Sequence, residues 1–112
     1  MNEDKKLTVL AAKAIGMEHP GGDHSIHDDG RLWDCQRLCW WNPLRDDGDA
    51  LRLAVNLQLG ISIPPVVDGR IEVVTFYGSI ISIVEYPQNN DRNAATRRAI
   101  VRAAAEIGKA MP

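Results

Sequence analysis

Two histidines and two cysteines in the first third of the chain are of the types that bind metal ions. His24, His27, Cys35 and Cys39 form the pattern H-x2-H-x7-C-x3-C. Zinc in tetrahedral sites accepts imidazole and thiolate ligands. However, a C-x3-C pair on a strand does not give the compact knuckle that a C-x2-C pair provides. The pattern therefore favours polar loop histidines with buried thiols, and a zinc site remains the alternative.

The same residues could support nucleophilic catalysis, in which a cysteine attacks and a nearby histidine takes its proton. The chain contains no Gly-x-Ser-x-Gly, P-loop or dinucleotide-binding sequence. We therefore expect a non-enzymatic protein without a cofactor, and a small hydrolase that uses the His/Cys loop is the alternative. On an extended strand Cys35 and Cys39 would lie about 13 Å apart, too far for a disulfide, so we expect reduced thiols.

Tryptophan and arginine side chains suggest a different chemistry, the binding of a partner. Three tryptophans lie close together at Trp33, Trp40 and Trp41. Neighbouring residues of a strand point to opposite faces, so at most one of Trp40 and Trp41 is fully buried. Core packing is the simpler interpretation, but an aromatic ring beside a polar loop could stack on a base or anchor a protein. We take Trp33 and Trp41 as candidate partner-binding residues.

Three arginines near the C-terminus, Arg97, Arg98 and Arg102, fall within one predicted helix. A solvated helix face is the simpler interpretation. Guanidinium groups also match phosphate and carboxylate groups bidentately, so the three could form a cationic binding site. Because no acidic run accompanies them, an acidic partner or an oligomer interface would suit this face.

The aspartates of the segment DDGD, residues 46–49, precede an apolar stretch. A calcium loop needs alternating oxygen ligands that end in a bidentate glutamate, and this segment lacks them. Asp46 or Asp47 can instead cap a helix, and Asp49 places favourable charge in its first turn. The segment therefore predicts the start of a helix that runs to about Gly60.

Two further helices follow from apolar spacing. The first covers residues 4–15 and ends at Gly16. The other is capped by Asp91 or Asn93 and runs to Met111 through alanine-rich sequence of high helix propensity. Its predicted buried stripe consists of Ala99, Ile100, Ala103, Ile107 and Met111.

Strands are predicted between the second and third helices. The segment ISIPP predicts a short edge strand, and RIEVVTFY and IISIVEYP flank Gly78-Ser79, which suits a two-residue type II′ turn. That turn pairs Val73 with Val84 and places apolar side chains on both faces. Helices on each side would cover both faces, so we predict an α+β fold, a three-layer α/β/α sandwich with a small, mainly antiparallel sheet and three helices.

Composition limits the class of protein. The 112 residues are 45% hydrophobic and 25% charged, which predicts one globular domain over residues 1–112. A net charge of −2 gives no reason to expect bulk nucleic-acid binding. No segment is apolar enough to span a membrane, and the charged start MNEDKK is unlike a signal peptide. These features are typical of a cytosolic protein.

Three segments carry a resemblance to a known family: LAAKAIGM, WNPLRDDGDALRLAV and AATRRAIVRAAAEIGKAM. Together they resemble the phage alpha-beta-alpha (ABA) sandwich domain family, small proteins of tailed phages and prophages. The resemblance spans nearly the whole chain except residues 18–35. It implies the same sandwich fold and a phage product in the cytoplasm of a bacterial host, and it supplies no catalytic residues.

The resemblance and the small size together suggest a counter-defence factor. Such a protein would bind a host immune protein or sequester a nucleotide signal. A core of this size also gains from association, so we expect a homo-oligomer.

Overall fold

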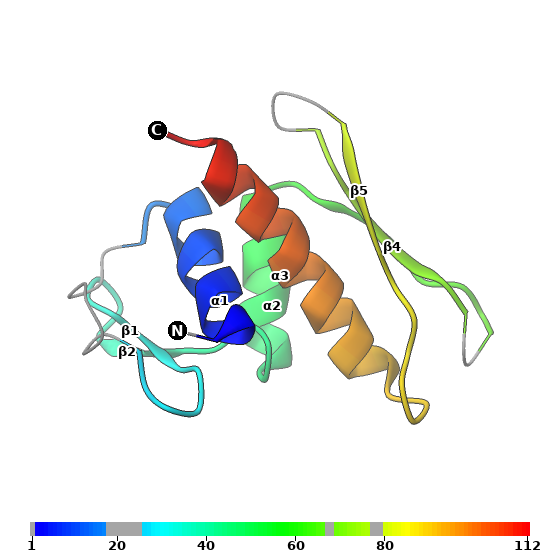
Figure 1. Cartoon of the computed structure of the whole chain (residues 1–112), viewed down its shortest axis with the longest axis horizontal. Coiled ribbons are helices and arrows are strands. Elements are labelled where there is room, and N and C mark those ends of the chain that lie inside the picture. Colours follow the sequence, from blue (N-terminus) through cyan, green and yellow to red (C-terminus); the bar gives the residue numbers. More distant parts are fainter. Residues whose placement is uncertain (1, 18–25, 67–68, 77–79) are drawn as a thin grey trace.

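A computed structural model describes residues 2–17, 26–66, 69–76 and 80–112 of the chain. The described part is a compact α+β fold with three helices and two small antiparallel sheets, consistent with a small α/β sandwich (Figure 1). This confirms the predicted α+β class with three helices and small antiparallel sheets. The elements in chain order are α1 Glu3–Ala14, β1 Leu32–Asp34, β2 Cys39–Trp41, α2 Asp47–Asn56, β3 Gly60–Ser62, β4 Ile71–Thr75, β5 Ile81–Glu85 and α3 Arg92–Ala110.

Each helix begins at a side chain that accepts a hydrogen bond from an otherwise unpaired backbone N–H group. Asn2 caps α1, Asp46 caps α2 by accepting from the amide of Asp49 at 2.8 Å, and Asp91 caps α3. Of the alternatives left open by the sequence, Asp46 and Asp91 are therefore the caps. Gly16 follows α1 with a φ of +67°, as the predicted helix stop requires.

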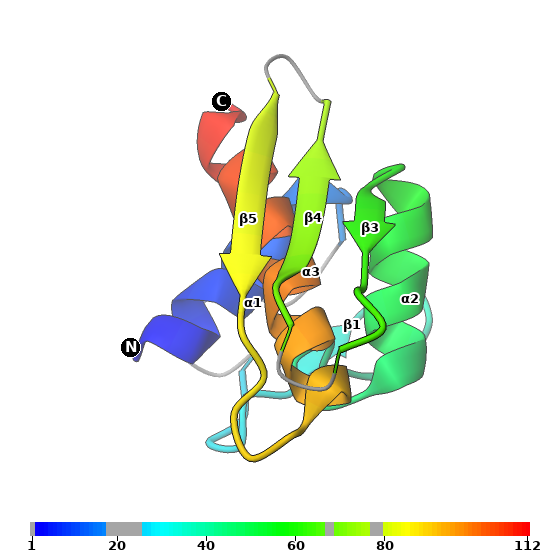
Figure 2. The same cartoon turned by 90° about the vertical axis from the view of Figure 1, so that its right-hand side faces the viewer.

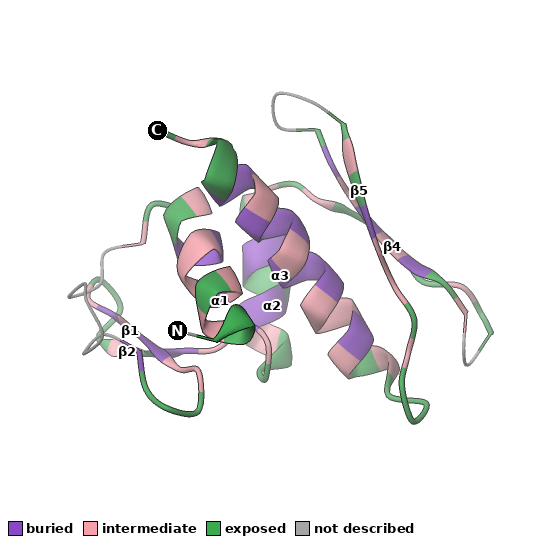
Figure 3. Cartoon of the chain, in the orientation of Figure 1, coloured by how far each residue is buried: buried purple, intermediate pink, exposed green. Residues whose placement is uncertain are grey.

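Helix α3 lies at the centre of the molecule, with α1 and α2 beside it (Figure 1). Four of the five residues of its predicted stripe are buried, and Met111 is half-buried. Burial extends further around the helix than predicted, because Val101, Ala104 and Ala105 are also enclosed (Figure 3). Small alanine side chains let neighbouring elements approach α3 closely on several sides.

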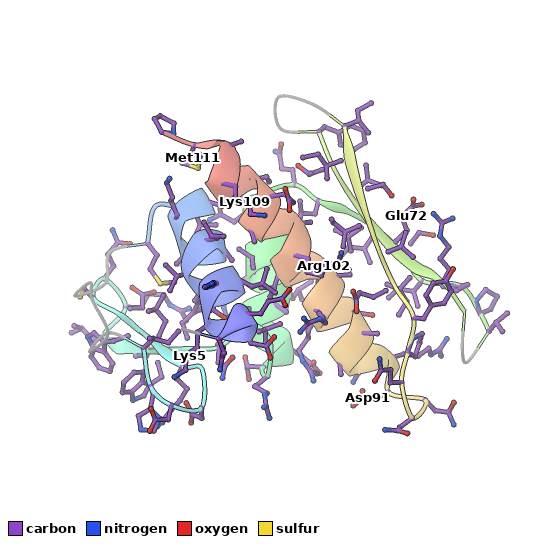
Figure 4. All side chains as sticks on the ribbon, viewed as in Figure 1. Lys5, Glu72, Asp91, Arg102, Lys109 and Met111 are labelled. Carbon is purple, nitrogen blue, oxygen red and sulfur yellow. The ribbon has the colours of Figure 1, made fainter. Side chains whose placement is uncertain are left out.

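The larger sheet has the order β3-β4-β5, with both pairs antiparallel. The helices lie behind it in Figure 2, and no helix of the described residues covers its other face. Alternate residues of β4 are buried against the helices, namely Ile71, Val73 and Thr75. Glu72 points away from the helices (Figure 4), where it accepts a hydrogen bond from the hydroxyl of Ser82. The predicted edge strand ISIPP is confirmed as β3.

The predicted register of the β4–β5 hairpin is wrong by one residue. Val73 pairs with Ile83 instead of Val84, and Thr75 pairs with Ile81. A shift of one residue moves every side chain of a strand to the other face. The observed register places Ile81 and Ile83 on the helix side together with Val73. In the described part of the chain, this is the face that helices cover. The predicted turn residues, Gly78 and Ser79, lie outside the described residues.

The smaller sheet pairs β1 with β2, and the segment 31–41 is therefore not one extended strand. Residues 35–38 form a turn in which the amide of Leu38 donates to the carbonyl of Asp34 at 2.9 Å. Asp34 pairs with Cys39 across the hairpin. The expected separation of about 13 Å between Cys35 and Cys39 along a strand does not apply. Both cysteines are free and half-buried.

Candidate functional site

The β1–β2 hairpin sorts its tryptophans onto two faces. Leu32 pairs with Trp41, and both are buried in the core. Trp33 pairs with Trp40 on the opposite face, and Trp40 is 40% exposed. The alternation of side chains along a strand accounts for this separation. One face of the hairpin therefore anchors it to the core and the other displays aromatic rings.

Three side chains hold Trp40 in place. The ring of Trp33 meets it edge to face with 5.3 Å between ring centroids, and His27 does so at 5.9 Å. The guanidinium carbon of Arg31 lies 4.7 Å from the centre of the Trp40 ring, within reach of a cation–π interaction. We call these four residues the tryptophan surface: His27, Arg31, Trp33 and Trp40. An exposed aromatic ring fixed in this way loses little conformational entropy when it binds a partner.

Asp29 positions Arg31 over the ring. One carboxylate oxygen of Asp29 accepts from both the backbone amide and the Nε of Arg31, at 3.1 and 3.0 Å. The hydrogen bond from the Arg31 amide is the main reason that the pKa of Asp29 lies below its usual value of 3.8. Because hydrogen bonds to the charged form favour it, Asp29 stays ionised at neutral pH.

A pH titration tests this arrangement. The folded-state pKa of Asp29 is lowered, so its stabilising contribution is complete above the unfolded-state pKa and is lost as pH falls through the lowered value. We expect carboxyl-detected NMR to give Asp29 a pKa below 3.8 and Arg31→Gln to raise it only in part, because the backbone amide of residue 31 still donates to the carboxylate. An unchanged pKa in the variant would show that the guanidinium group of Arg31 does not contribute to the shift.

The predicted contact residues are not all accessible. Trp33 belongs to the tryptophan surface, but Trp41 is only 3% exposed and belongs to the core. A partner at the hairpin would therefore meet Trp40, which the sequence left as the alternative to Trp41. Sequence reasoning missed Arg31, whose only signal was a cationic side chain two residues before Trp33.

The candidate metal ligands are only partly described. His24 lies outside the described residues, whereas His27 packs against Trp40. Within residues 2–17, 26–66, 69–76 and 80–112, no group of three or more histidine, cysteine, aspartate or glutamate side chains could hold a metal ion. The described residues alone therefore offer no zinc site.

The three arginines of α3 bind carboxylates of other elements instead of forming one cationic site. Arg97 donates to Asp47 at 2.6 Å and to the carbonyl of Leu44 at 3.0 Å. Arg98 donates to Asp4 at 2.9 Å, and this hydrogen bond is the main reason that its pKa is raised. The sequence of α3 shows no acidic run beside these arginines, and the acidic partners of Arg97 and Arg98 come instead from α2 and α1.

Arg102 makes the third of these connections, between α3 and β5 (Figure 4). It donates to the carbonyl of Val84 and forms an ion pair with Glu85, whose carboxylate also lies 3.9 Å from Arg98. The arginines therefore join α3 to its neighbours, and a phosphate group would have to displace these partners to bind them.

Comparisons with protein-family models, with curated proteins and with solved structures find no match for the chain. The resemblance to the phage sandwich family therefore remains a prediction. In the described part of the chain, no helix is both long and apolar enough to cross a membrane.

Proposed function

We propose that the chain is a non-enzymatic binding domain that contacts a protein partner through the tryptophan surface. The observation that carries this proposal is the exposed ring of Trp40, which Trp33, His27 and Arg31 hold in one position. Tryptophan and arginine are enriched among the few residues that dominate binding energy at protein interfaces. A rigid aromatic ring flanked by a guanidinium group combines both.

The proposed partner follows from the sequence resemblance. A small phage protein without catalytic motifs is suited to counter-defence, and the partner would be a host immune protein in the bacterial cytoplasm. A mixed aromatic and cationic surface fits a protein better than bulk nucleic acid, because the chain has a net charge of −2.

Sequestration of a nucleotide signal is the weaker version of this proposal. It relied on Arg97, Arg98 and Arg102, and each of them is bonded to a carboxylate of another element. A nucleotide would compete with these ion pairs for the guanidinium groups. The zinc-binding domain or small hydrolase remains the alternative, and the zinc content of the purified chain would test it.

We also propose that the chain works as a homo-oligomer. The surface that would join the copies is distinct from the tryptophan surface.

Capture of host proteins by the tagged chain tests the tryptophan surface. We expect Trp40→Ala to weaken binding of the partner by roughly 30-fold, the loss of about 2 kcal/mol typical of a dominant interface residue. Quantitative mass spectrometry of captured proteins, followed by binding measurements with the purified partner, would show the loss.

The matched control is Ile80→Ala, which also removes an exposed apolar side chain but from the β4–β5 hairpin. We expect this variant to capture the partner as the unmodified chain does. Equal capture by Trp40→Ala and the unmodified chain would contradict the proposal.

A further inference from the structure

An apolar groove lies between α2, β3 and α3, away from the tryptophan surface. It has a volume of about 240 Å³ and is lined mainly by Ala50, Leu51, Ile61, Ile63, Thr96 and Ile100. Leu51 and Ile63 are 60% and 51% exposed although both are large and apolar. Val55 follows Leu51 by one helical turn and is also exposed, so the apolar surface continues along α2. An exposed apolar surface of this kind marks an interaction site.

Strand β3 borders this groove and forms an edge of the sheet beside α2 (Figure 2). Gly60, Ile61 and Ser62 are all exposed. Within the described residues, no side chain forms a hydrogen bond with the backbone of this strand. An open edge strand next to an apolar groove is the arrangement that accepts a further strand: backbone hydrogen bonds supply affinity, and alternate side chains fill the groove.

The other edge strand, β5, is protected. Arg102 donates to the carbonyl of Val84 on β5 at 3.1 Å and also pairs with Glu85. Charged side chains placed at an edge discourage the addition of another strand. The contrast between the two edges singles out β3 as the one that is open to pairing.

The charge of the groove decides what kind of partner fits. Asp47 and Arg97 are the charged residues of its lining, and they form an ion pair at 2.6 Å. Among the described residues, the lining therefore carries no net charge and offers no unpaired charged side chain to a phosphate or to a strongly charged peptide. Two such neutral surfaces can approach without like-charge repulsion, which would otherwise cost several kcal/mol.

We propose that β3 and the groove form the interface between two copies of this chain. The segment around β3 can itself fill the groove of a second copy, because Leu59, Ile61 and Ile63 alternate as apolar residues on the strand and directly beside it. Antiparallel pairing of β3 with its counterpart about a two-fold axis presents Ile61 and Ile63 of each copy to the surface of the other. The two three-stranded sheets then form one continuous antiparallel sheet. This inference rests on the proposed homo-oligomer and is independent of the tryptophan surface.

Sedimentation equilibrium over a range of concentrations tests the interface. We expect the unmodified chain to be a dimer and Leu51→Lys and Ile63→Lys each to raise the dissociation constant at least about 10-fold, since a charge would be buried without a partner. Ile80→Lys makes the same kind of change at an exposed isoleucine of the β4–β5 hairpin, away from the groove, and should leave the dimer unchanged. Circular dichroism checks that each variant is folded.

A second measurement uses the unmodified chain and so does not depend on the folding of a variant. Hydrogen exchange within residues 60–62 should be slower in a concentrated sample than in a dilute one, because dimer formation pairs the amides that point away from β4. A monomer at every concentration, equal exchange at both, or a dimer that the folded lysine variants leave intact would each overturn the proposal. Trp40→Ala should still form the dimer, and Leu51→Lys should still capture the host partner, so the two proposals can fail separately.

Discussion

The replacement Gly108→Ala is expected to lower the free energy of unfolding by about 3 kcal/mol, at the upper end of the usual cost of overpacking. A Cβ atom at residue 108 would lie 2.0 Å from the backbone carbonyl oxygen of Leu10. Because this oxygen belongs to the backbone of α1, α1 and α3 would have to move apart. Urea denaturation of the variant and of the unmodified chain would measure the difference.

The matched control is the same substitution in another helix, Gly48→Ala in α2. There the nearest atoms are the flexible side-chain ends of Arg52 and Asp46, at 3.2 and 3.3 Å. Alanine favours the helix over glycine by roughly 0.5–1 kcal/mol, so this variant should be as stable as the unmodified chain or slightly more stable. Equal losses at Gly48 and Gly108 would show that contact with Leu10 is not the cause.

The second large effect is expected for Asp49→Ala, which should cost about 2–3 kcal/mol because it removes two hydrogen bonds to a charged group. Asp49 is 8% exposed, and its carboxylate accepts from the amide of Asn42 at 2.9 Å and from Arg52 at 2.6 Å. It thus connects the end of the β1–β2 hairpin to α2. Without it the amide of Asn42 loses its acceptor, and thermal unfolding should report the loss.

Asp47→Ala is the control for this prediction. Asp47 is close in sequence and also pairs with an arginine, Arg97, but its side chain is 66% exposed. Ion pairs with exposed partners contribute about 1 kcal/mol or less, so the loss should be much smaller than at Asp49. If both variants lose the same stability, burial of the Asp49 carboxylate does not explain its contribution.

Local signals in the sequence were sufficient for where the helices begin, whereas α2 ends at Asn56, before the predicted end near Gly60. Asp46 and Asp91 act as caps, Gly16 ends α1, and the alanine-rich stripe of α3 is buried. Each of these features depends on residues within about one helical turn of each other, so the neighbouring sequence determines it. The role of Asp49 was only half apparent, because its bond to Asn42 depends on where the preceding hairpin ends.

Strand pairing was harder to predict because it depends on the turn and on distant packing. The assumption of a two-residue turn shifted the β4–β5 register by one residue and suggested two apolar faces. The same difficulty affected the tryptophans. Alternation shows that Trp40 and Trp41 face opposite ways, but only pairing with Leu32 shows that Trp41 faces the core.

The candidate site depended on contacts that no short sequence pattern predicts. Arg97 and Arg98 lie 50 and 94 residues from their acidic partners, Asp47 and Asp4. Read as part of one helix, the arginines looked free to bind a phosphate group. In the fold they are largely neutralised, which moves the proposed contact from α3 to the hairpin.

The central position of α3 has a consequence for how the chain folds during synthesis. α1 packs against α3, and α3 follows every other helix and strand along the chain. When α1 leaves the ribosome, the helix on which it packs has not been made. Contacts between segments so far apart in sequence form slowly, because a long loop must close first. The core therefore assembles only after α3 has emerged, and until then the apolar faces of α1 and α2 are uncovered and prone to aggregation.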